Sequence, residues 1–109
     1  MGTAHLMFTN PVMGRPGPGR SPDPLQMVKL GTSGLETTLL GFGTGVKAGM
    51  RQSALTRQAR EKSIAAIRHA YDRGIRMFDN ADTYGSHQLI AEALKTMDRE
   101  KLTLTSKIW

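Results

Sequence analysis

The sequence predicts an α/β fold in which short parallel strands alternate with helices. Three short apolar runs have the length and composition of buried strands, at residues 39–44, 75–78 and 102–105. Two segments between them, residues 57–72 and 88–97, carry apolar side chains at helical spacing. This alternation implies right-handed crossovers and a parallel sheet, in either a doubly wound sheet or a β/α barrel. Both architectures place their chemistry at the carboxyl ends of the strands.

The first 26 of the 109 residues differ from the rest in composition. All five prolines lie there, together with Gly14, Gly17 and Gly19. Such a segment does not sustain a helix or a strand ladder. We therefore expect a disordered leader over residues 1–26 and one small domain over residues 27–109, with Met27 as an alternative start.

Charge and cysteine content restrict the class of protein. The chain has no cysteine, which rules out disulfides and cysteine metal sites, and we assign no metal ligand. A reducing compartment fits this composition, and we expect a cytoplasmic protein. The net charge is +6, but the basic residues are spread along one long segment, which favours a solvated face over a nucleic-acid site. No apolar run approaches the roughly 20 residues that span a bilayer. We expect no nucleic-acid or membrane partner, and oligomeric state is open.

A β-hairpin is predicted, with its two arms at residues 27–30 and 35–38. Each arm alternates apolar and polar side chains, and Gly31 and Gly34 mark the turn between them. The next run, residues 39–44, is apolar and ends in glycine and threonine, which predicts the first buried parallel strand.

Residues 43–48 match the pattern G-x-G-x-x-A of dinucleotide-binding loops. That fingerprint requires a helix to begin at once, so that its amide groups meet a pyrophosphate. Here Gly49 follows, and residues 50–55 show no helical period. We therefore interpret the stretch as a loop after a strand. A glycine in it still allows the backbone to approach a ligand closely.

The first long helix is predicted over residues 57–72. Thr56 is its expected N-cap, and Gly74 suits its C-terminal stop. His69 is expected on the surface rather than in a ligand site. The inward side of the helix is predicted to comprise Ile64, Ile67, Ala70 and Tyr71.

The remaining elements repeat the pattern of strand and helix. Residues 75–78 predict the second parallel strand, and Ser86 is expected to cap a helix over residues 88–97. A polar connection at residues 98–101 leads to the third strand at residues 102–105. The inward side of the second helix is predicted to comprise Leu89, Ile90, Ala93, Leu94 and Met97.

Three ionisable side chains fall at the ends of two successive predicted strands. Asp79 follows the second strand, Tyr84 lies five residues later, and Lys107 follows the third strand. A phenol beside an ammonium ion is a stronger acid than one in water, and a carboxylate can hold the ammonium in place. Such a phenol can protonate a carbonyl oxygen while a hydride reaches the carbon. The hydride must come from a cofactor, because no side chain donates one.

The same three residues also have a structural interpretation. An aspartate in a turn after a strand commonly caps the following backbone. A tyrosine beyond it is commonly a packing residue with a solvated hydroxyl, and a lysine at a strand end is commonly exposed. Spacing alone favours this structural interpretation over catalysis.

A resemblance to a known family supports the catalytic interpretation. Residues 78–85, Phe-Asp-Asn-Ala-Asp-Thr-Tyr-Gly, resemble the signature of the aldo-keto reductases. The resemblance covers about residues 27–109 in the family's order. It includes the hairpin at 30–35, the strand at 40–44, the helix end at 70–75, and the stretches 93–95, 99–101 and 105–109.

The resemblance implies the N-terminal portion of a (β/α)8 TIM barrel with an N-terminal β-hairpin. Members of the family use NADPH/NADP+ and reduce a small-molecule carbonyl substrate, an aldehyde or a ketone, to an alcohol by hydride transfer. The resemblance further implies that Asp79, Tyr84 and Lys107 are catalytic. Tyr84 would donate the proton, and Lys107 would make it a stronger acid.

Further roles follow from the same resemblance. Gly43, Thr44 and Asp79 would contact the cofactor, and Trp109 would form an aromatic wall of the substrate pocket. Asn80 departs mildly from the family, in which Thr or Ser is more usual at that position. The family's catalytic histidine and the part that grips the adenosine phosphate would lie beyond Trp109.

We therefore expect an NADP-dependent aldo-keto reductase whose N-terminal part is this chain, and we expect the 109 residues alone to be inactive. The alternative is a non-catalytic, cofactor-binding regulatory subunit of the same fold. The sequence leaves open the identity of the substrate and the preference for NADPH over NADH.

Overall fold

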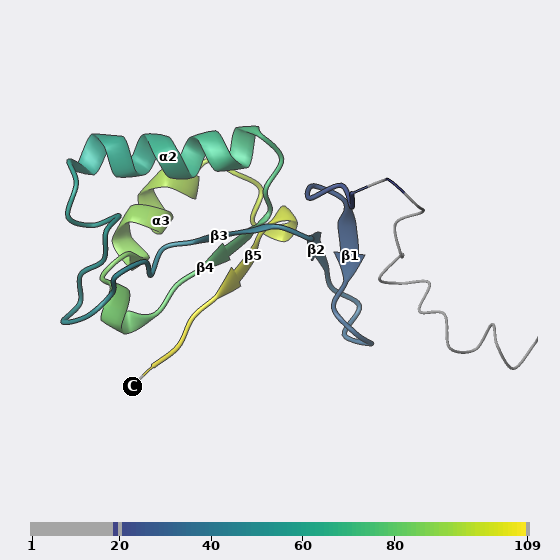
Figure 1. Cartoon of the computed structure of the whole chain (residues 1–109), viewed down its shortest axis with the longest axis horizontal. Helices are drawn as coiled ribbons and strands as arrows, with labels where there is room; N and C mark the ends of the chain where they lie inside the picture. The colour runs from purple at the N-terminus through teal and green to yellow at the C-terminus, as the bar shows by residue number, and fades with distance from the viewer. Residues whose placement is uncertain (1–18, 20, 109) are drawn as a thin grey trace, which may run out of the picture.

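The computed structural model describes residue 19 and residues 21–108. Along the chain the elements are β1 (Met27–Lys29), β2 (Glu36–Thr38), β3 (Gly41–Gly43), α2 (Arg60–Asp72), β4 (Met77–Asp79), the 3₁₀ helix η1 (Asp82–Tyr84), α3 (His87–Leu94), the 3₁₀ helix η2 (Arg99–Lys101) and β5 (Thr103–Thr105) (Figure 1). Most of the predicted leader, residues 1–26, and all of Trp109 lie outside the described residues.

The sheet is parallel, as the alternation of strands and helices predicts. β3, β4 and β5 are neighbours in that order, and both pairings are parallel. The register aligns Phe42 with Phe78 and Phe78 with Leu104. Because alternate residues of a strand point to opposite faces, these three side chains share one face of the sheet. The described strands form an open sheet rather than a closed barrel.

β1 and β2 form a separate antiparallel pair before the sheet, with Val28 opposite Thr37. Thr38 ties this pair to β4, because its hydroxyl accepts a hydrogen bond from the Arg76 amide at 3.0 Å and donates one to the Leu40 carbonyl at 2.7 Å. The amide of Leu40 in turn donates to the carbonyl of Pro24 at 2.8 Å. Hydrogen bonds also join Leu25 and Gln26 to Asp23, so hydrogen-bonded structure begins before the domain boundary expected at Met27.

α2 begins at Arg60, three residues later than the prediction, and Thr56 is not its N-cap. The Thr56 hydroxyl accepts a hydrogen bond from the Ser53 amide at 2.7 Å, so it closes the preceding turn instead. The predicted C-terminal stop is confirmed. Gly74 has a φ of +108°, a left-handed conformation that favours glycine, and its amide donates to the Tyr71 carbonyl at 2.9 Å.

α3 spans His87–Leu94, so it ends three residues before the predicted end at Met97. Ser86 does precede the helix, but its side chain makes no capping hydrogen bond. The Ser86 hydroxyl is bonded instead to Thr44 and Asn80, outside the helix. The prediction that Ser86 caps the helix is wrong, because its hydroxyl bonds to Thr44 and Asn80 from other segments of the chain instead.

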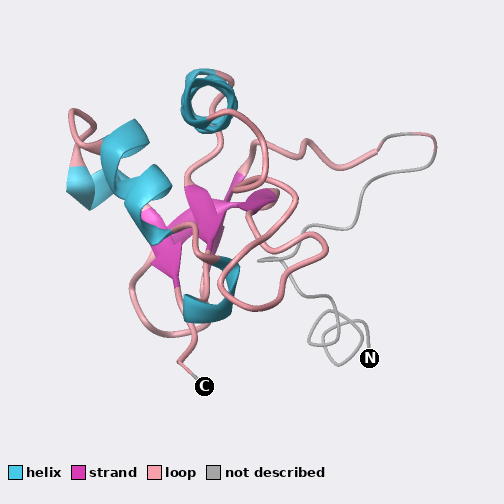
Figure 2. Ribbon diagram, turned by 90° about the vertical axis from the view of Figure 1, so that its left-hand side faces the viewer, coloured by secondary structure: helices cyan, strands magenta, loops and turns pink. Residues whose placement is uncertain are grey.

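The apolar core lies between the sheet and the two α-helices. Figure 2 shows α2 and α3 on the same side of the sheet, and Phe78 at its centre is fully buried. Burying one such side chain contributes about 1.5–3 kcal/mol. Both predicted helix stripes supply the core, which comprises Ile64, Ile67, Ala70, Phe78, Leu89, Ile90, Ala93, Leu94 and Leu102. His69 is exposed, as expected.

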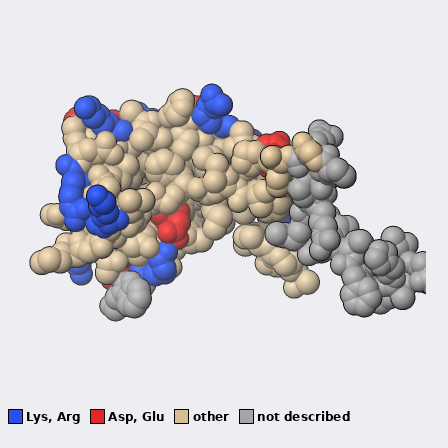
Figure 3. All heavy atoms as spheres, in the orientation of Figure 1, with Lys and Arg blue, Asp and Glu red and all other residues tan. Residues whose placement is uncertain are grey.

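The surface adds two observations. Lys and Arg side chains lie in several separate groups on the face shown in Figure 3, with Asp and Glu among them. Among the described residues, neither α2 nor α3 is long and apolar enough to cross a bilayer.

Candidate active site

The carboxyl ends of the three parallel strands bring the predicted site together. Gly43, Asp79 and Thr105 are register partners, so their positions lie side by side on the face of the sheet opposite Phe78. Pairing continues past the strands, because the Asn80 amide donates to the Thr105 carbonyl at 2.9 Å. The Asp82 amide likewise donates to the Lys107 carbonyl at 3.0 Å. The chain after β4 therefore runs beside the chain after β5.

Asp79 and Lys107 form a hydrogen-bonded ion pair. Lys107 Nζ donates to Asp79 Oδ1 at 2.7 Å, and Thr105 Oγ1 donates to the same oxygen at 2.5 Å. The side chains are 37% and 43% exposed for Asp79 and Lys107, so the pair lies at the rim of the sheet rather than in the core. Its carboxylate holds the ammonium group in a defined place, as the sequence predicted.

The surroundings shift the pKa of both charged groups. Partial burial acts to raise the pKa of Asp79, but the hydrogen bonds from Lys107 and Thr105 and the charge of Lys107 outweigh it, and the pKa is lowered. The pKa of Lys107 is raised, chiefly by its hydrogen bond to Asp79, against a smaller effect of desolvation. The Tyr84 hydroxyl contributes in the same direction. Both groups are therefore held in their charged forms.

Tyr84 completes the cluster. It ends η1, and Lys107 Nζ lies 5.1 Å from the centroid of its ring. Gly85 follows with a φ of +69°, and its amide donates to the Asp82 carbonyl at 3.3 Å, which closes the turn. The structure thus brings Asp79, Tyr84 and Lys107 together from the ends of β4 and β5. An ammonium ion between a carboxylate and a phenol can stabilise a phenolate, so the cluster is suited to proton donation.

Gly43 and Thr44, two of the three residues predicted to contact a cofactor, differ in their surroundings. Gly43 is exposed, and a Cβ added there would meet no atom within 4 Å. Its backbone is therefore open to a flat group on the same face as Asp79. Thr44 is only 1% exposed, and its hydroxyl donates to the Asp79 carbonyl at 2.7 Å. No helix begins between residues 43 and 59, which agrees with the loop interpretation of residues 43–48.

A buried polar cluster, formed by Thr44, Asn80 and Ser86, lies beneath the site. Thr44 Oγ1 lies 2.7 Å from Ser86 Oγ, and Ser86 Oγ donates to Asn80 Oδ1 at 3.1 Å. The three residues come from the end of β3, the end of β4 and the residue before α3. Buried polar groups of this kind are stable only when hydrogen-bonded to one another. The cluster therefore fixes the two ends of the loop that carries Tyr84.

The sequence analysis missed several residues that position the site. Thr105 donates a hydrogen bond directly to Asp79. The sequence signal for this role is that Thr105 lies two residues before Lys107, since alternate side chains of an extended chain point to the same side. His87 Nε2 lies 2.8 Å from Ser106 Oγ and so links the start of α3 to the residue before Lys107. No local pattern identifies that link, because it joins segments far apart in the sequence.

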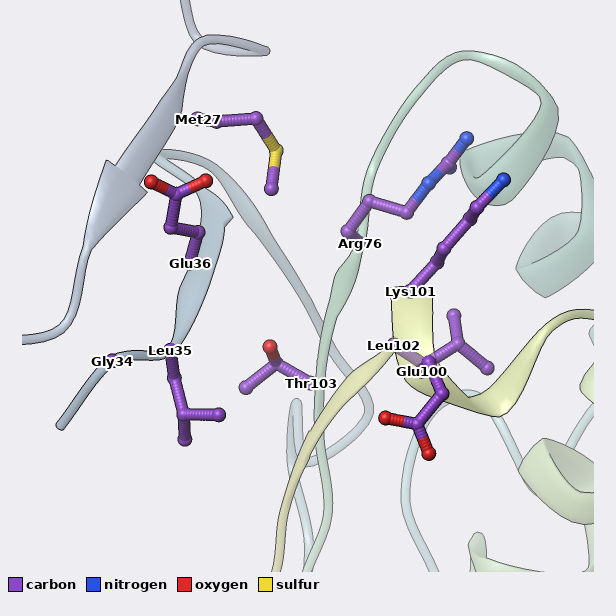
Figure 4. A pocket seen from close by; sticks show the side chains of 9 residues that line it. All are labelled: Met27, Gly34, Leu35, Glu36, Arg76, Glu100, Lys101, Leu102 and Thr103. Atoms are coloured by element: carbon purple, nitrogen blue, oxygen red, sulfur yellow. The ribbon is translucent and has the colours of Figure 1, made fainter.

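A cavity lies at the other end of the sheet. It has a volume of about 520 Å³ and lies between the β1–β2 pair and the start of β5. Figure 4 shows Met27 and Leu35 on one side of it and Arg76 and Thr103 on the other. These residues flank the amino ends of β4 and β5, whereas α/β proteins place their chemistry at the carboxyl ends. The cavity therefore does not belong to the Asp79 site.

Comparisons with known proteins point to one family. A family model described as "Aldo/keto reductase family" matches residues 39–109. A Glycine max protein named "Probable aldo-keto reductase 1" is 40% identical over 86 residues, which cover 76% of this chain and 24% of that protein. A Melia azedarach protein named "7-acetyl-epi-neemfruitin B aldo-keto reductase" is 34% identical over 89 residues, which cover 75% of this chain and 25% of that protein.

A solved structure is also similar. It is the crystal structure of a thermostable aldo-keto reductase with the inhibitor epalrestat, with a TM-score of 0.63 and 31% sequence identity. The match covers 77% of this chain and 31% of that one. The chain spans about a quarter of the length of the two curated relatives.

Proposed function

This chain belongs to the aldo/keto reductase family of oxidoreductases, and from that membership we propose that it forms part of an NADPH-dependent enzyme that reduces aldehydes and ketones to alcohols. One observation carries the proposal. The Lys107 ammonium donates to the Asp79 carboxylate at 2.7 Å and lies 5.1 Å from the centre of the Tyr84 ring. This is the arrangement that a phenol acting as general acid requires.

Members of the family generally use NADP(H), and the reduced nicotinamide supplies the hydride when it is bound. The open backbone at Gly43 fits a flat ring at that position, on the same face as Asp79. The Thr44 hydroxyl already bonds to the Asp79 carbonyl and to Ser86 Oγ. We therefore assign Thr44 a supporting role at the edge of the cofactor site rather than a hydrogen bond to the cofactor.

The proton comes from this chain. In the proposed reaction the Tyr84 hydroxyl donates its proton to the carbonyl oxygen of the substrate, and the phenolate that forms is stabilised by the Lys107 ammonium. Asp79 keeps Lys107 charged and in place through its 2.7 Å hydrogen bond. Trp109, by family resemblance, forms part of the wall around the substrate.

The proposal includes the organisation and location of the protein. Residues 27–109 would form the first part of a (β/α)8 barrel, with β1 and β2 as the hairpin before its first strand. The parallel order β3-β4-β5 and the likeness to a solved family member support this arrangement. A cytoplasmic location is consistent with the absence of cysteine.

A Tyr84→Phe substitution in the native protein that carries this sequence tests the proposal. We expect kcat/KM for a generic aldehyde with NADPH to fall by about 10²–10⁴, because general acid catalysis contributes factors of this size. Tyr71→Phe is the matched control, since Tyr71 lies in α2 and is the only other tyrosine in the chain. Steady-state kinetics of the wild-type protein and the two variants provide the measurement.

Two outcomes would contradict the proposal. Turnover of Tyr84→Phe within a factor of two of the wild type would exclude Tyr84 as the proton donor. A wild-type protein that binds NADPH but shows no turnover with a panel of aldehydes and ketones would indicate the regulatory subunit instead.

A further inference from the structure

The ring of Tyr84 lies directly against the backbone of Gly45. A Cβ added to Gly45 would lie 2.6 Å from Cε2 and 2.8 Å from Cε1 of that ring, and closer still to Cζ, the carbon that carries the hydroxyl. Carbon atoms in contact are normally about 3.5–4.0 Å apart. The reactive end of the ring therefore occupies the space that any side chain at position 45 would need.

Backbone conformation does not explain the glycine at position 45. Gly45 is absent from the described glycines with positive φ, which include Gly74 and Gly85. An alanine would therefore suit its backbone without strain. The three atoms nearest to a Cβ at position 45 all belong to the Tyr84 ring, so a side chain there requires that ring to move.

A second close contact fixes the residue after Tyr84. A Cβ on Gly85 would overlap the carbonyl oxygen of Arg51, so the loop after β3 also lies against Gly85. The same loop holds Lys47, Met50 and Arg51 at φ values of 53°, 50° and 58°, which is a disfavoured conformation for residues with side chains. The surrounding structure must stabilise a loop that is strained in this way.

We propose that Gly45 is a positioning residue, and that the loop formed by residues 45–55 holds the Tyr84 ring beside Lys107. The flat Gly45 backbone supports one face of the ring, while the Arg51 carbonyl fixes Gly85. A side chain at position 45 displaces the Tyr84 hydroxyl from Lys107. The consequence for turnover rests on the proposed function, whereas the contact itself does not.

Nuclear magnetic resonance of the native protein tests the contact without turnover. A proton close to the face of an aromatic ring resonates upfield. We expect upfield-shifted Hα signals for Gly45 and upfield-shifted ε-methylene signals for Lys107, whose Nζ lies 5.1 Å from the ring centroid. Both shifts should persist in Tyr84→Phe, which keeps the ring, and disappear in Tyr84→Leu, which removes it.

The Gly45→Ala variant then tests the positioning role. We expect the Lys107 shift to fall to half or less of its wild-type value, because the added methyl group displaces the ring. Gly49→Ala is the matched control, since Gly49 lies in the same loop, lacks a positive φ and has open space where a Cβ would stand. In that control the Lys107 shift should be unchanged.

Turnover gives an independent measurement. We expect kcat of Gly45→Ala to fall by about 100-fold, the effect of a small displacement of a reacting group, and kcat of Gly49→Ala to stay within a factor of two of the wild type. Retention of the wild-type Lys107 shift in Gly45→Ala would overturn the positioning role. If Gly45→Ala does not fold, the Gly45 Hα protons provide the test instead. Equal chemical shifts of these protons in Tyr84→Phe and Tyr84→Leu would overturn the positioning role.

The positioning role and the proposed reaction can fail separately. Ring-current shifts as expected, together with full turnover in Tyr84→Phe, would support the contact and exclude the proposed reaction. Loss of turnover in Tyr84→Phe without any ring-current effect at Gly45 or Lys107 would support the reaction and exclude the contact.

Discussion

At Asp79 a single carboxylate oxygen accepts hydrogen bonds from two side chains. Lys107 and Thr105 donate to Oδ1, and both bonds favour the ionised carboxylate. The ion pair is more than one-third exposed, so salt screens it and it adds little to the free energy of unfolding. The main role of the ion pair is therefore to place an ammonium group beside Tyr84.

The lowered pKa of Asp79 predicts a dependence of stability on pH. A carboxyl group with a lower pKa in the folded state stabilises that state above the usual pKa of about 3.9, and this stabilisation is lost as the pH falls through the folded-state value. We therefore expect the difference in Tm between the wild type and Asp79→Asn to be present at pH 6 and to shrink towards pH 3.

Thermal unfolding of the native protein at several pH values, at low ionic strength, gives the measurement. Lys107→Met is the companion variant, because removal of the ammonium group removes the main source of the lowered pKa. In the Lys107→Met background, the change in Tm caused by Asp79→Asn should vary less with pH. A difference in Tm that is the same at pH 3 and pH 6 in the wild-type background would contradict the prediction.

At the scale of elements, the buried polar cluster joins three segments that are separate in the sequence. Thr44, Asn80 and Ser86 are 1%, 3% and 0% exposed, and they come from the ends of β3 and β4 and from the start of α3. The Thr44 hydroxyl bonds to two of these segments, because it donates to the Asp79 carbonyl and pairs with Ser86 Oγ. The loop that carries Tyr84 is thereby fixed at both ends.

Replacement of Thr44 tests this role of the cluster. Thr44→Val keeps the shape of the side chain but puts a methyl group in place of the hydroxyl that bonds to the Asp79 carbonyl and to Ser86 Oγ. We expect the free energy of unfolding to fall by about 1–3 kcal/mol, the usual effect of a buried polar group that loses its hydrogen bond. Chemical denaturation of the native protein measures this change. Thr44→Ser, which retains the hydroxyl, should lose less, and equal losses in both variants would argue against the hydrogen bonds as the cause.

At the scale of the whole molecule, the described chain covers only one face of its sheet. α2 and α3 pack on the side of Phe78, while Gly43, Asp79 and Thr105 occupy the other side without a helix over them. Leu104 is 39% exposed although it is the register partner of buried Phe78. Within the described residues, β3 and β5 each pair on one side only. Open strand edges of this kind pair readily with other chains.

These features predict the behaviour of the 109-residue chain by itself. We expect broad, non-cooperative thermal unfolding, association at higher concentration, weak binding of NADPH and no turnover, because the half-covered sheet buries too little apolar surface. Calorimetry, analytical ultracentrifugation and cofactor titration provide the measurements. A sharp transition, with equal calorimetric and van't Hoff enthalpies, would contradict the prediction.

The α/β order, the parallel sheet and the candidate catalytic residues could all be predicted from the sequence. Strands and helices have local signals, since apolar side chains recur with period two or 3.6 wherever one face is buried. Thus Ile64, Ile67 and Ala70 were recognised as one buried stripe, and Gly74 as the end of α2. The signature around Asp79 and Tyr84 is likewise contiguous in the chain. The leader over residues 1–26 and the role of Trp109 stay predictions.

The hydrogen-bond partner of each polar side chain depends on the tertiary structure and could not be predicted in this way. Thr56 and Ser86 have the composition of helix caps, yet Thr56 closes a turn with Ser53 and Ser86 bonds to Thr44, which lies 42 residues away. The fit of the Tyr84 ring against Gly45 depends equally on two distant segments. A hydroxyl or a glycine has several possible roles locally. The choice among them depends on which groups the folded chain brings within hydrogen-bond or contact distance, and local periodicity carries no information about that.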